Sequence, residues 1–300
     1  MARTRDRGWP EPPEPLPVAV VDNHTHFDTV LPWEADGWDP SLDDHLARAA
    51  SVGVTRMVQV GCDLPAIAWT DTAVREHHQL LGAVAIHPNE AVRHAEVVEH
   101  APDGLDPEEP YDVSLADAID EVARVARSNP RIRAIGETGL DHFRAGPRGR
   151  AVQREAFRAH IALAKELGLA LQIHDRDAHD EVVEVLLADG APDRTVFHCF
   201  SGDAGLARLA VDYGWYLSFA GPVSFKANDE LRRALREVPP SRLLVETDAP
   251  YLTVHPFRGR PNAPYLLPGT VRTVAEVTER PLPDVCATLS ATSETVYGTW

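Results

Sequence analysis

Short apolar runs alternate along the chain with longer segments in which apolar residues recur at helical spacing. The runs are nearly continuous in apolar residues, which is typical of strands buried on both faces of a parallel sheet. We therefore expect eight strands separated by helices. The eight runs are VAVVDNHTHF (18–27), RMVQVGC (56–62), LLGAVAIHP (80–88), IRAIGETGLD (132–141), LALQIHDR (169–176), TVFHCF (195–200), WYLSFAG (215–221) and RLLVETDAP (242–250).

The segments between the runs have the pattern of amphipathic helices. In REAFRAHIALAKELG, one helical face carries Ala156, His160, Leu163 and Leu167, and Gly168 follows as a stop signal. Eight strands that alternate with helices within about 250 residues match an α/β fold, the closed (β/α)8 or TIM barrel. A doubly wound open sheet is the alternative, but no GxGxxG follows the first run, so the pattern favours the barrel.

Three segments fall outside this alternation. Residues 1–17 contain five prolines and mixed charge, so we expect a flexible tail there and a single barrel domain over residues 18–300. The acidic stretch 89–113 is longer than most connections from a strand to a helix. It is therefore either a mobile loop at the rim of the barrel or a small excursion near the site. Residues 253–268, rich in proline and arginine, follow the eighth run.

Composition and charge narrow the range of functions. Hydrophobic residues make up 44% and charged residues 25% of the 300 residues, as in ordinary globular proteins. No window approaches the roughly 20 apolar residues that cross a bilayer, and the N-terminus lacks the apolar core of a secretory signal. The 29 Lys and Arg against 46 Asp and Glu give a net charge of −17. This balance argues against wide nonspecific binding of long nucleic-acid duplexes.

The three cysteines, Cys62, Cys199 and Cys286, are widely spaced and form no CxxC pair. This spacing predicts neither a disulfide framework nor a zinc knuckle, and it favours the reducing cytoplasm as the location. Cys199 stands beside a candidate metal ligand. We interpret it as a small core residue, with a nucleophile as the alternative.

Six residues that are able to bind metal fall at the carboxyl-terminal ends of the predicted strands. In a barrel these ends meet around one mouth, where the active sites of this fold lie. Residues distant in sequence are therefore expected to converge on one metal site. The six are His24 and His26 on the first strand, Glu137 on the fourth, His174 on the fifth, His198 on the sixth and Asp248 on the eighth.

The side chains of these residues suit divalent cations. His24 and His26 lie two positions apart in a strand, so both point to one face, which must be the barrel interior if they share an ion. Imidazoles suit Zn, Fe, Ni or Mn, and carboxylates admit harder ions as well. The two oxygens of Glu137 could bridge two ions. The alternatives are a buried salt bridge for Glu137 and hydrogen-bonded core residues for His174 and His198.

Asp248 is the candidate proton acceptor. It follows LLVET and precedes Ala-Pro, where the strand must stop. A carboxylate at this stop could bind one ion or take a proton from metal-activated water, whose pKa falls towards neutrality. Asp248 and Glu137 are therefore the predicted catalytic carboxylates.

Five motifs resemble, in this order, those of the TatD-type metal-dependent hydrolases of the amidohydrolase superfamily: DNHTHFD, GETGLD, QIHDRDA, FHCFSG and ETDAPYL. The resemblance spans about residues 18–297. It implies hydrolysis of phosphodiesters, typically in DNA, with two divalent ions such as Mg, Mn or Zn. It also implies one ion on His24, His26, Glu137 and Asp248, and a second on Glu137, His174 and His198.

Three further residues are weaker candidates, for contacts with substrate. AIHP resembles the end of the family's third strand and would place His87 near the substrate, although a capping or core histidine is an even alternative. SFKAN resembles the family's seventh-strand motif and would put Lys226 on the rim as a phosphate contact, unless it is a solvated lysine at a helix start. Arg176 could face phosphate or pair with Asp175 or Asp177.

The chain departs from the family pattern in three places. Asn262-Ala263-Pro264 stands where Asn-Glu-Pro is usual, His142 replaces an aromatic residue often found after GLD, and the 89–113 stretch has no clear counterpart. These departures concern the substrate rather than the six ligands.

The leading hypothesis is therefore a TatD-like deoxyribonuclease that uses two divalent ions and cleaves DNA ends or short single strands. The alternative is an enzyme of the same barrel that acts on a small amide, lactone or phosphoester. A binding protein with a purely structural metal is a distant third, because structural sites are usually closed and four-coordinate. If the substrate is nucleic acid, Lys226, Arg176 and Arg258 should form a small basic rim on an otherwise acidic surface. No membrane association and no obligate protein partner are expected.

Overall fold

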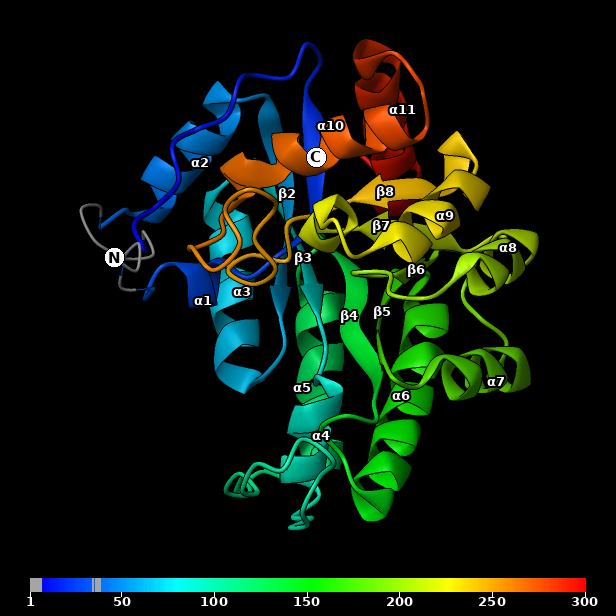
Figure 1. Cartoon of the computed structure of the whole chain (residues 1–300). Coiled ribbons are helices and arrows are strands. Elements are labelled where there is room, and N and C mark those ends of the chain that lie inside the picture. Colours follow the sequence, from blue (N-terminus) through cyan, green and yellow to red (C-terminus); the bar gives the residue numbers. More distant parts are fainter. Residues whose placement is uncertain (1–6, 34, 36–38) are drawn as a thin grey trace, which may run out of the picture.

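Eight parallel strands form the centre of the structure and are hydrogen-bonded in the order in which they occur along the chain (Figure 1). The structure is a computed structural model that describes residues 7–33, 35 and 39–300. Because the strands are parallel and each pairs with its sequence neighbours, all eight carboxyl-terminal strand ends lie at the same rim of the barrel. The strands are β1 (Val20–Thr25), β2 (Val54–Gly61), β3 (Leu80–Val84), β4 (Ile132–Asp141), β5 (Ala170–Arg176), β6 (Thr195–Phe197), β7 (Tyr216–Phe219) and β8 (Leu243–Val245).

The sheet closes on itself between β1 and the residues that follow β8. Asp248 N donates to His24 O at 3.0 Å, and His26 N donates to Ala249 O at 2.9 Å. A parallel bridge joins Thr25 to Ala249. The predicted (β/α)8 barrel is thereby confirmed. The closure also places three of the six predicted ligands side by side.

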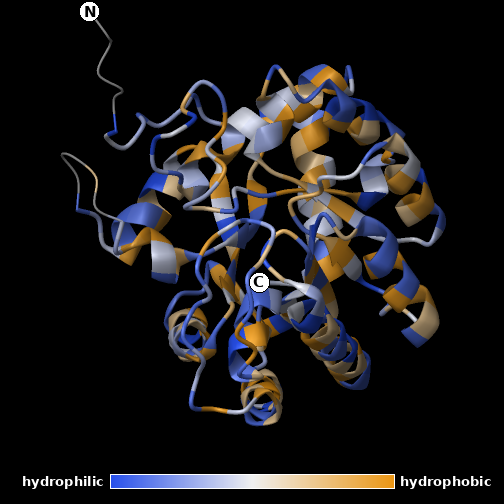
Figure 2. Ribbon diagram, turned by 60° about the horizontal axis from the view of Figure 1, so that its bottom comes forward, coloured by the Kyte–Doolittle hydropathy of each residue, from blue (hydrophilic) through white to orange (hydrophobic). Residues whose placement is uncertain are grey.

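Helices surround the strands and turn their hydrophobic residues towards them (Figure 2). No helix of the described residues is long and apolar enough to cross a membrane. The helices are α1 (Phe27–Val30), α2 (Leu42–Ser51), α3 (Leu64–Glu76), α4 (Pro88–His94), α5 (Leu115–Ser128), α6 (Pro147–Leu167), α7 (His179–Asp189), α8 (Ala204–Asp212), α9 (Asp229–Glu237), α10 (Leu267–Val277) and α11 (Leu282–Tyr297), with short 3-10 helices η1 (Gly221–Ser224), η2 (Pro240–Arg242) and η3 (Pro264–Leu266).

The longest helix, α6, follows from its sequence in detail. It begins with proline in its first turn, where the missing N–H costs no hydrogen bond. Gly168 ends it in the left-handed conformation at φ 62°, which glycine adopts without steric cost. Ala156, His160 and Leu163 are buried, as the helical spacing predicts.

Residues 7–17 correct the prediction of a flexible tail. Trp9 and Leu16 are buried, and Tyr265 Oη donates a 2.7 Å hydrogen bond to Pro10 O. The proline content predicted an extended segment without packing contacts. The two apolar side chains, Trp9 and Leu16, are nevertheless enough to hold this extended segment against the barrel. The first six residues, where the tail was also predicted, lie outside the described residues.

The 89–113 stretch starts as a helix instead of a loop. α4 covers its first residues, and the coil that follows turns back onto α4. There the Tyr111 ring lies under the Arg93 guanidinium at 3.9 Å, and Tyr111 Oη donates to Glu90. Several of its residues line the cavity at the strand ends. Of the two alternatives, the structure agrees with the excursion beside the site.

His160 is fixed as a neutral imidazole in the core. Its Nδ1 donates to Ala156 O at 2.7 Å, and its Nε2 accepts from Ile86 N at 3.2 Å. Protonation would remove the acceptor, and burial lowers the pKa of His160 to about 4.

His160 should therefore make stability depend on pH. Below pH 6.5 the unfolded chain binds a proton that the folded chain does not, so the free energy of unfolding falls by about 1.4 kcal/mol per pH unit as pH drops towards 4. The replacement His160→Gln keeps an acceptor but cannot titrate. We expect urea unfolding with EDTA to show a smaller loss for this variant between pH 7 and 5, by about 2 kcal/mol. The exposed His78→Gln is the control, and an unchanged pH dependence in His160→Gln would contradict this role.

Candidate metal centre

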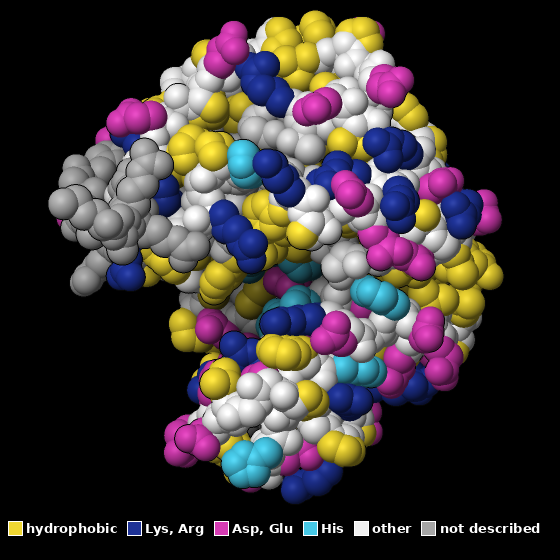
Figure 3. Space-filling view, viewed as in Figure 1, with side chains coloured by type: hydrophobic (Ala, Val, Ile, Leu, Met, Phe, Trp, Pro, Cys, Tyr) yellow, Lys and Arg dark blue, Asp and Glu magenta, His cyan; other side chains and the backbone are white. Residues whose placement is uncertain are grey.

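The carboxyl-terminal ends of the strands open into a cavity of about 1520 Å³, which we call the mouth. Figure 3 shows the hollow, with histidine and acidic side chains inside it. Of the six predicted ligands, five line the mouth, and His24 lies directly beneath them with no exposed area. The structure therefore brings all six together.

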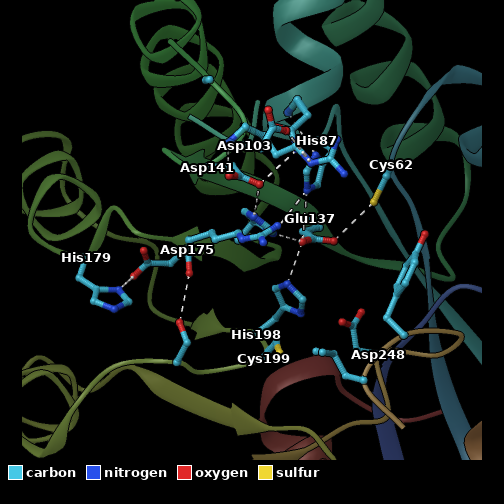
Figure 4. A pocket seen from close by; sticks show the side chains of 18 of the residues that line it. Cys62, His87, Asp103, Glu137, Asp141, Asp175, His179, His198, Cys199 and Asp248 are labelled. Carbon is cyan, nitrogen blue, oxygen red and sulfur yellow. Dashed lines mark hydrogen bonds and ion pairs between the residues drawn. The ribbon is translucent and has the colours of Figure 1, made fainter. Parts of the chain in front are cut away.

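Glu137 stands in the middle of this group (Figure 4), and it lies within β4, four residues before the strand ends at Asp141. Its side chain is only 6% exposed, and its two oxygens face different neighbours. Oε2 lies 3.4 Å from His24 Nε2, whereas Oε1 lies 2.5 Å from His174 Nδ1 and 2.8 Å from His198 Nε2. One carboxylate thus touches both halves of the cluster.

The first half joins β1 to the residue that closes the barrel. His24 Nε2 and His26 Nε2 are 3.1 Å apart, so the two histidines do share one face, as their spacing predicts. Asp248 Oδ1 lies 3.5 Å from His26 Nε2 and 3.9 Å from His24 Nε2. Asp248 has φ 54°, a left-handed conformation that Asp and Asn tolerate better than most residues.

The second half joins β5 to the end of β6. His174 and His198 both face Glu137, and their rings lie 5.9 Å apart between centroids. The His198 ring also stacks on the His24 ring at 4.0 Å, which connects the two halves. His87 Nε2 lies 3.6 Å from Glu137 Oε1 and borders this half.

Two acidic residues hold the histidines of the second half from behind, and sequence reasoning did not identify either. Asp141 Oδ2 lies 3.2 Å from His174 Nε2, and Glu246 Oε1 lies 3.0 Å from His198 Nδ1. Each carboxylate thus fixes the nitrogen that faces away from Glu137. Both acidic residues could have been considered from the sequence, because they lie within motifs that also contain predicted ligands: Asp141 ends GETGLD, and Glu246 begins ETDAPYL.

The charges of the cluster depend on one another. Burial alone would raise the pKa of Glu137, but the imidazoles of His198, His87 and His174 hold it well below its ordinary value. Burial alone would lower the pKa of His174, but the Glu137 charge raises it to about 9. The cluster is therefore an ionised carboxylate surrounded by imidazoles.

The donor set fits divalent cations. Ligand atoms of His24, His26 and Asp248 lie within 4.8 Å of one another, and so do those of His24, Glu137 and His198, and of His87, Glu137 and His174. Nitrogen and carboxylate donors at such spacing suit first-row divalent ions. Buried ionised groups are stabilised by ion pairing or by binding a metal, and this cluster has the donor atoms for both.

Two thiols, those of Cys62 and Cys199, lie at the mouth. Cys62 Sγ lies 3.7 Å from Glu137 Oε2, and Cys199 lines the mouth half-buried. Cys199 is therefore not the small core residue that we expected. Burial, and then the neighbouring carboxylates, raise the pKa of both thiols well above the ordinary value, which leaves them protonated.

The three predicted substrate contacts have different positions. His87 lines the mouth and also caps α4, since its Nδ1 accepts from Asn89 N at 3.1 Å. Arg176 lines the mouth with its guanidinium over the Phe143 ring at 4.1 Å. Lys226 is exposed after η1 and is not among the described residues that line the mouth. It fits the alternative of a solvated lysine near a helix start.

Only part of the predicted basic rim of Lys226, Arg176 and Arg258 lies among the described residues at the mouth. Arg258 is exposed, and its guanidinium lies over the Phe225 ring at 4.9 Å instead of at the mouth. Arg176 is the one member of the predicted rim found among the described lining residues.

A (β/α)8 barrel whose mouth gathers histidines and carboxylates around one shared carboxylate defines a metal-dependent hydrolase. The comparison with protein families gives the particular group. The model of the TatD related DNase family matches residues 21–298, and the chain belongs to this family. The resemblance seen in the motifs is thereby confirmed.

Individual relatives agree with this assignment. The chain is 40% identical over 287 residues to an uncharacterized metal-dependent hydrolase, TatD, of Mycobacterium tuberculosis, covering 93% of this chain and 98% of that protein. It is 32% identical over 240 residues to a protein of Klebsiella pneumoniae named 3′-5′ ssDNA/RNA exonuclease TatD, covering 78% and 82%. The crystal structure of a TatD homologue of Escherichia coli K12 superposes with a TM-score of 0.78 at 23% identity over 93% of this chain and 97% of that one, which supports the fold.

Proposed function

We propose that this hydrolase is a nuclease that holds two divalent ions at the mouth and cleaves phosphodiesters at the ends of single-stranded DNA. The observation that carries the proposal is the position of Glu137. One oxygen faces His24 at 3.4 Å and the other faces His174 and His198. A carboxylate placed in this way could serve both ions of a two-metal hydrolase, one with each oxygen. The name of the Klebsiella relative supports the substrate class.

The residues divide into two sets of ligands. His24, His26 and Asp248 would hold the first ion with Glu137 Oε2, and His174 and His198 the second with Oε1. When bound, divalent ions supply Lewis acidity to a phosphoryl oxygen and lower the pKa of a water. Asp248, 8% exposed at the edge of the mouth, is placed to accept the proton of the attacking water. The negative charge of Glu137 would offset the repulsion between two bound cations.

A cleavage assay tests the proposed substrate. We expect a labelled single strand to be shortened from an end in the presence of Mg, Mn or Zn, and the matching closed duplex to be cut far less. Because the described lining residues include only three arginines and no lysine, salt should weaken binding with a shallow slope, about 0.7 per phosphate contacted. A steep slope with equal cleavage of duplex would contradict the proposal.

A small-molecule hydrolase is the second candidate, and the acidity of the mouth favours it. Nine aspartates and five glutamates are among the described residues that line the mouth. An acidic mouth repels long polyanions unless bound cations offset its charge. Turnover of a small ester or lactone with metal, and none of any nucleic acid, would establish this second function in place of the first.

Metal binding should strengthen as pH rises. Burial alone would lower the pKa of His26, but its hydrogen bond with Asp248 raises it to about 9, and His174 likewise titrates at about 9. An ion binds only the neutral imidazoles, so below pH 9 it must displace protons. We expect the affinity for Zn, measured against a chelator, to rise by roughly tenfold per pH unit for each displaced proton between pH 6 and 9. An affinity independent of pH would contradict these positions as ligands.

Glu246 should act on metal affinity through His198. The replacement Glu246→Gln keeps the volume but loses the charge behind Nδ1 of His198, which lies 3.0 Å away. Loss of such a supporting partner costs about 10–100-fold in metal affinity. We expect this loss for one ion only, measured by equilibrium dialysis. Glu155→Gln, at an exposed position on α6, is the matched control, and equal affinities in the two variants would count against the role.

A further inference from the structure

The mouth has too little positive charge to hold a strand by its phosphates. Its described lining residues include three arginines, and two of them are already engaged. Arg93 is ion-paired with Glu90 at 3.0 Å, and Arg144 lies 3.6 Å from Asp103. If the proposed nuclease function is right, the bound ions would hold the phosphate that is cleaved, and few side chains remain to hold the neighbouring phosphates, so uncharged contacts should contribute to the affinity for a strand.

Tyr251 offers such a contact. It lines the mouth, and 51% of its surface is exposed, whereas Phe200, the other Phe or Tyr among the described lining residues, is 4% exposed. The Tyr251 ring lies 6.1 Å from the His26 ring between centroids, with its plane at 69° to it. The ring thus stands directly beside the first half of the metal centre.

The backbone of Tyr251 is held in place although its ring is exposed. Tyr251 N donates to Asp248 O at 2.8 Å. Asn262, which is buried, donates from Nδ2 to Tyr251 O and also to Thr247 O at 2.9 Å. A fixed backbone lowers the entropic cost of using the ring in binding.

We propose that Tyr251 is the platform on which an unpaired nucleobase stacks when the adjoining phosphodiester lies at the metal centre. A phosphate near His26 brings an attached nucleoside to the neighbouring ring, because the two rings stand 6.1 Å apart. Stacking on an aromatic side chain needs no positive charge and tolerates every base, since each base has a π face. It also requires that the base be unpaired, so it selects frayed or single-stranded ends over closed duplex.

The test is a cycle of protein and substrate changes, measured as kcat/KM with Mn. The proteins are wild type, Tyr251→Ala and Tyr251→Phe, with Tyr213→Ala as the control. Tyr213 is 54% exposed and lines a small pocket away from the mouth. The substrates are a short single strand and strands in which each of the two terminal nucleotides at either end is replaced in turn by an abasic residue.

We expect Tyr251→Ala to reduce cleavage of the intact strand by roughly 5- to 150-fold, the range that base stacking supplies. Tyr251→Phe and Tyr213→Ala should remain close to wild type. For the strand whose abasic position is that of the stacking base, wild type and Tyr251→Ala should have the same kcat/KM, because the base that would stack on the ring is absent. An equal loss on every strand, or no loss on the intact strand, overturns the stacking role while the nuclease function stands. Failure of wild type to cleave any strand removes the nuclease function, and this subsite with it.

Discussion

Asp248→Asn should reduce turnover by about 10²–10⁴-fold, the usual contribution of a general base. The amide keeps the shape of the carboxylate but neither accepts a proton nor carries charge. The backbone should not change, because asparagine also tolerates the left-handed conformation that Asp248 adopts at φ 54°. The closing hydrogen bond from the amide N of residue 248 to His24 O also survives, since it belongs to the main chain.

The experiment compares kcat and bound metal in wild type and Asp248→Asn. The ion at His174 and His198 should be retained, because Asp248 belongs to the other half of the cluster. A variant with turnover near that of wild type would remove Asp248 from the mechanism. Loss of both ions would show instead that it acts mainly as a structural anchor.

Glu137→Gln should have the widest effect, because both halves of the cluster depend on this one side chain. Loss of a residue that only supports a ligand costs about 10–100-fold in metal affinity, and loss of the shared ligand should exceed this for both ions. Excess Mn should therefore fail to restore activity. By contrast, His198→Ala should weaken the second ion alone and be partly rescued by excess metal. Rescue of Glu137→Gln to wild-type activity would contradict the shared position.

The sequence predicted the barrel and the convergence of six side chains for a physical reason. Runs buried on both faces must be strands of a covered sheet, and parallel strands in sequential order deliver their ends to one rim. The positions of His24, Glu137 and Asp248 therefore followed from where each apolar run stops. The face shared by His24 and His26 followed from the two-residue period of a strand.

What the sequence could not predict depends on distances across the barrel. Asp141 and Glu246 matter because they lie behind His174 and His198, and strand periodicity does not tell which acid faces which ring. Lys226 was placed at the rim by its motif, and its neighbours Ala227 and Asn228 do line the mouth, but the exposed Lys226 side chain is not among the described lining residues.

The N-terminal segment was misread for a similar reason. A proline-rich composition predicts that the segment is extended, but it does not predict that the segment packs against the barrel. Trp9 and Leu16 are buried because the barrel provides a surface that the sequence does not reveal.

The central claim is that Glu137 joins two ions in one centre, and a titration of the metal-free protein with Mn, followed by electron paramagnetic resonance, tests it most directly. We expect two ions per chain at saturation and a spectrum in which the two spins are coupled, since ions bridged by one carboxylate lie about 3.5–4 Å apart. The coupled signal should be absent from Glu137→Gln. A wild-type protein that binds one ion at saturating Mn, or two ions with independent spectra, would contradict the account.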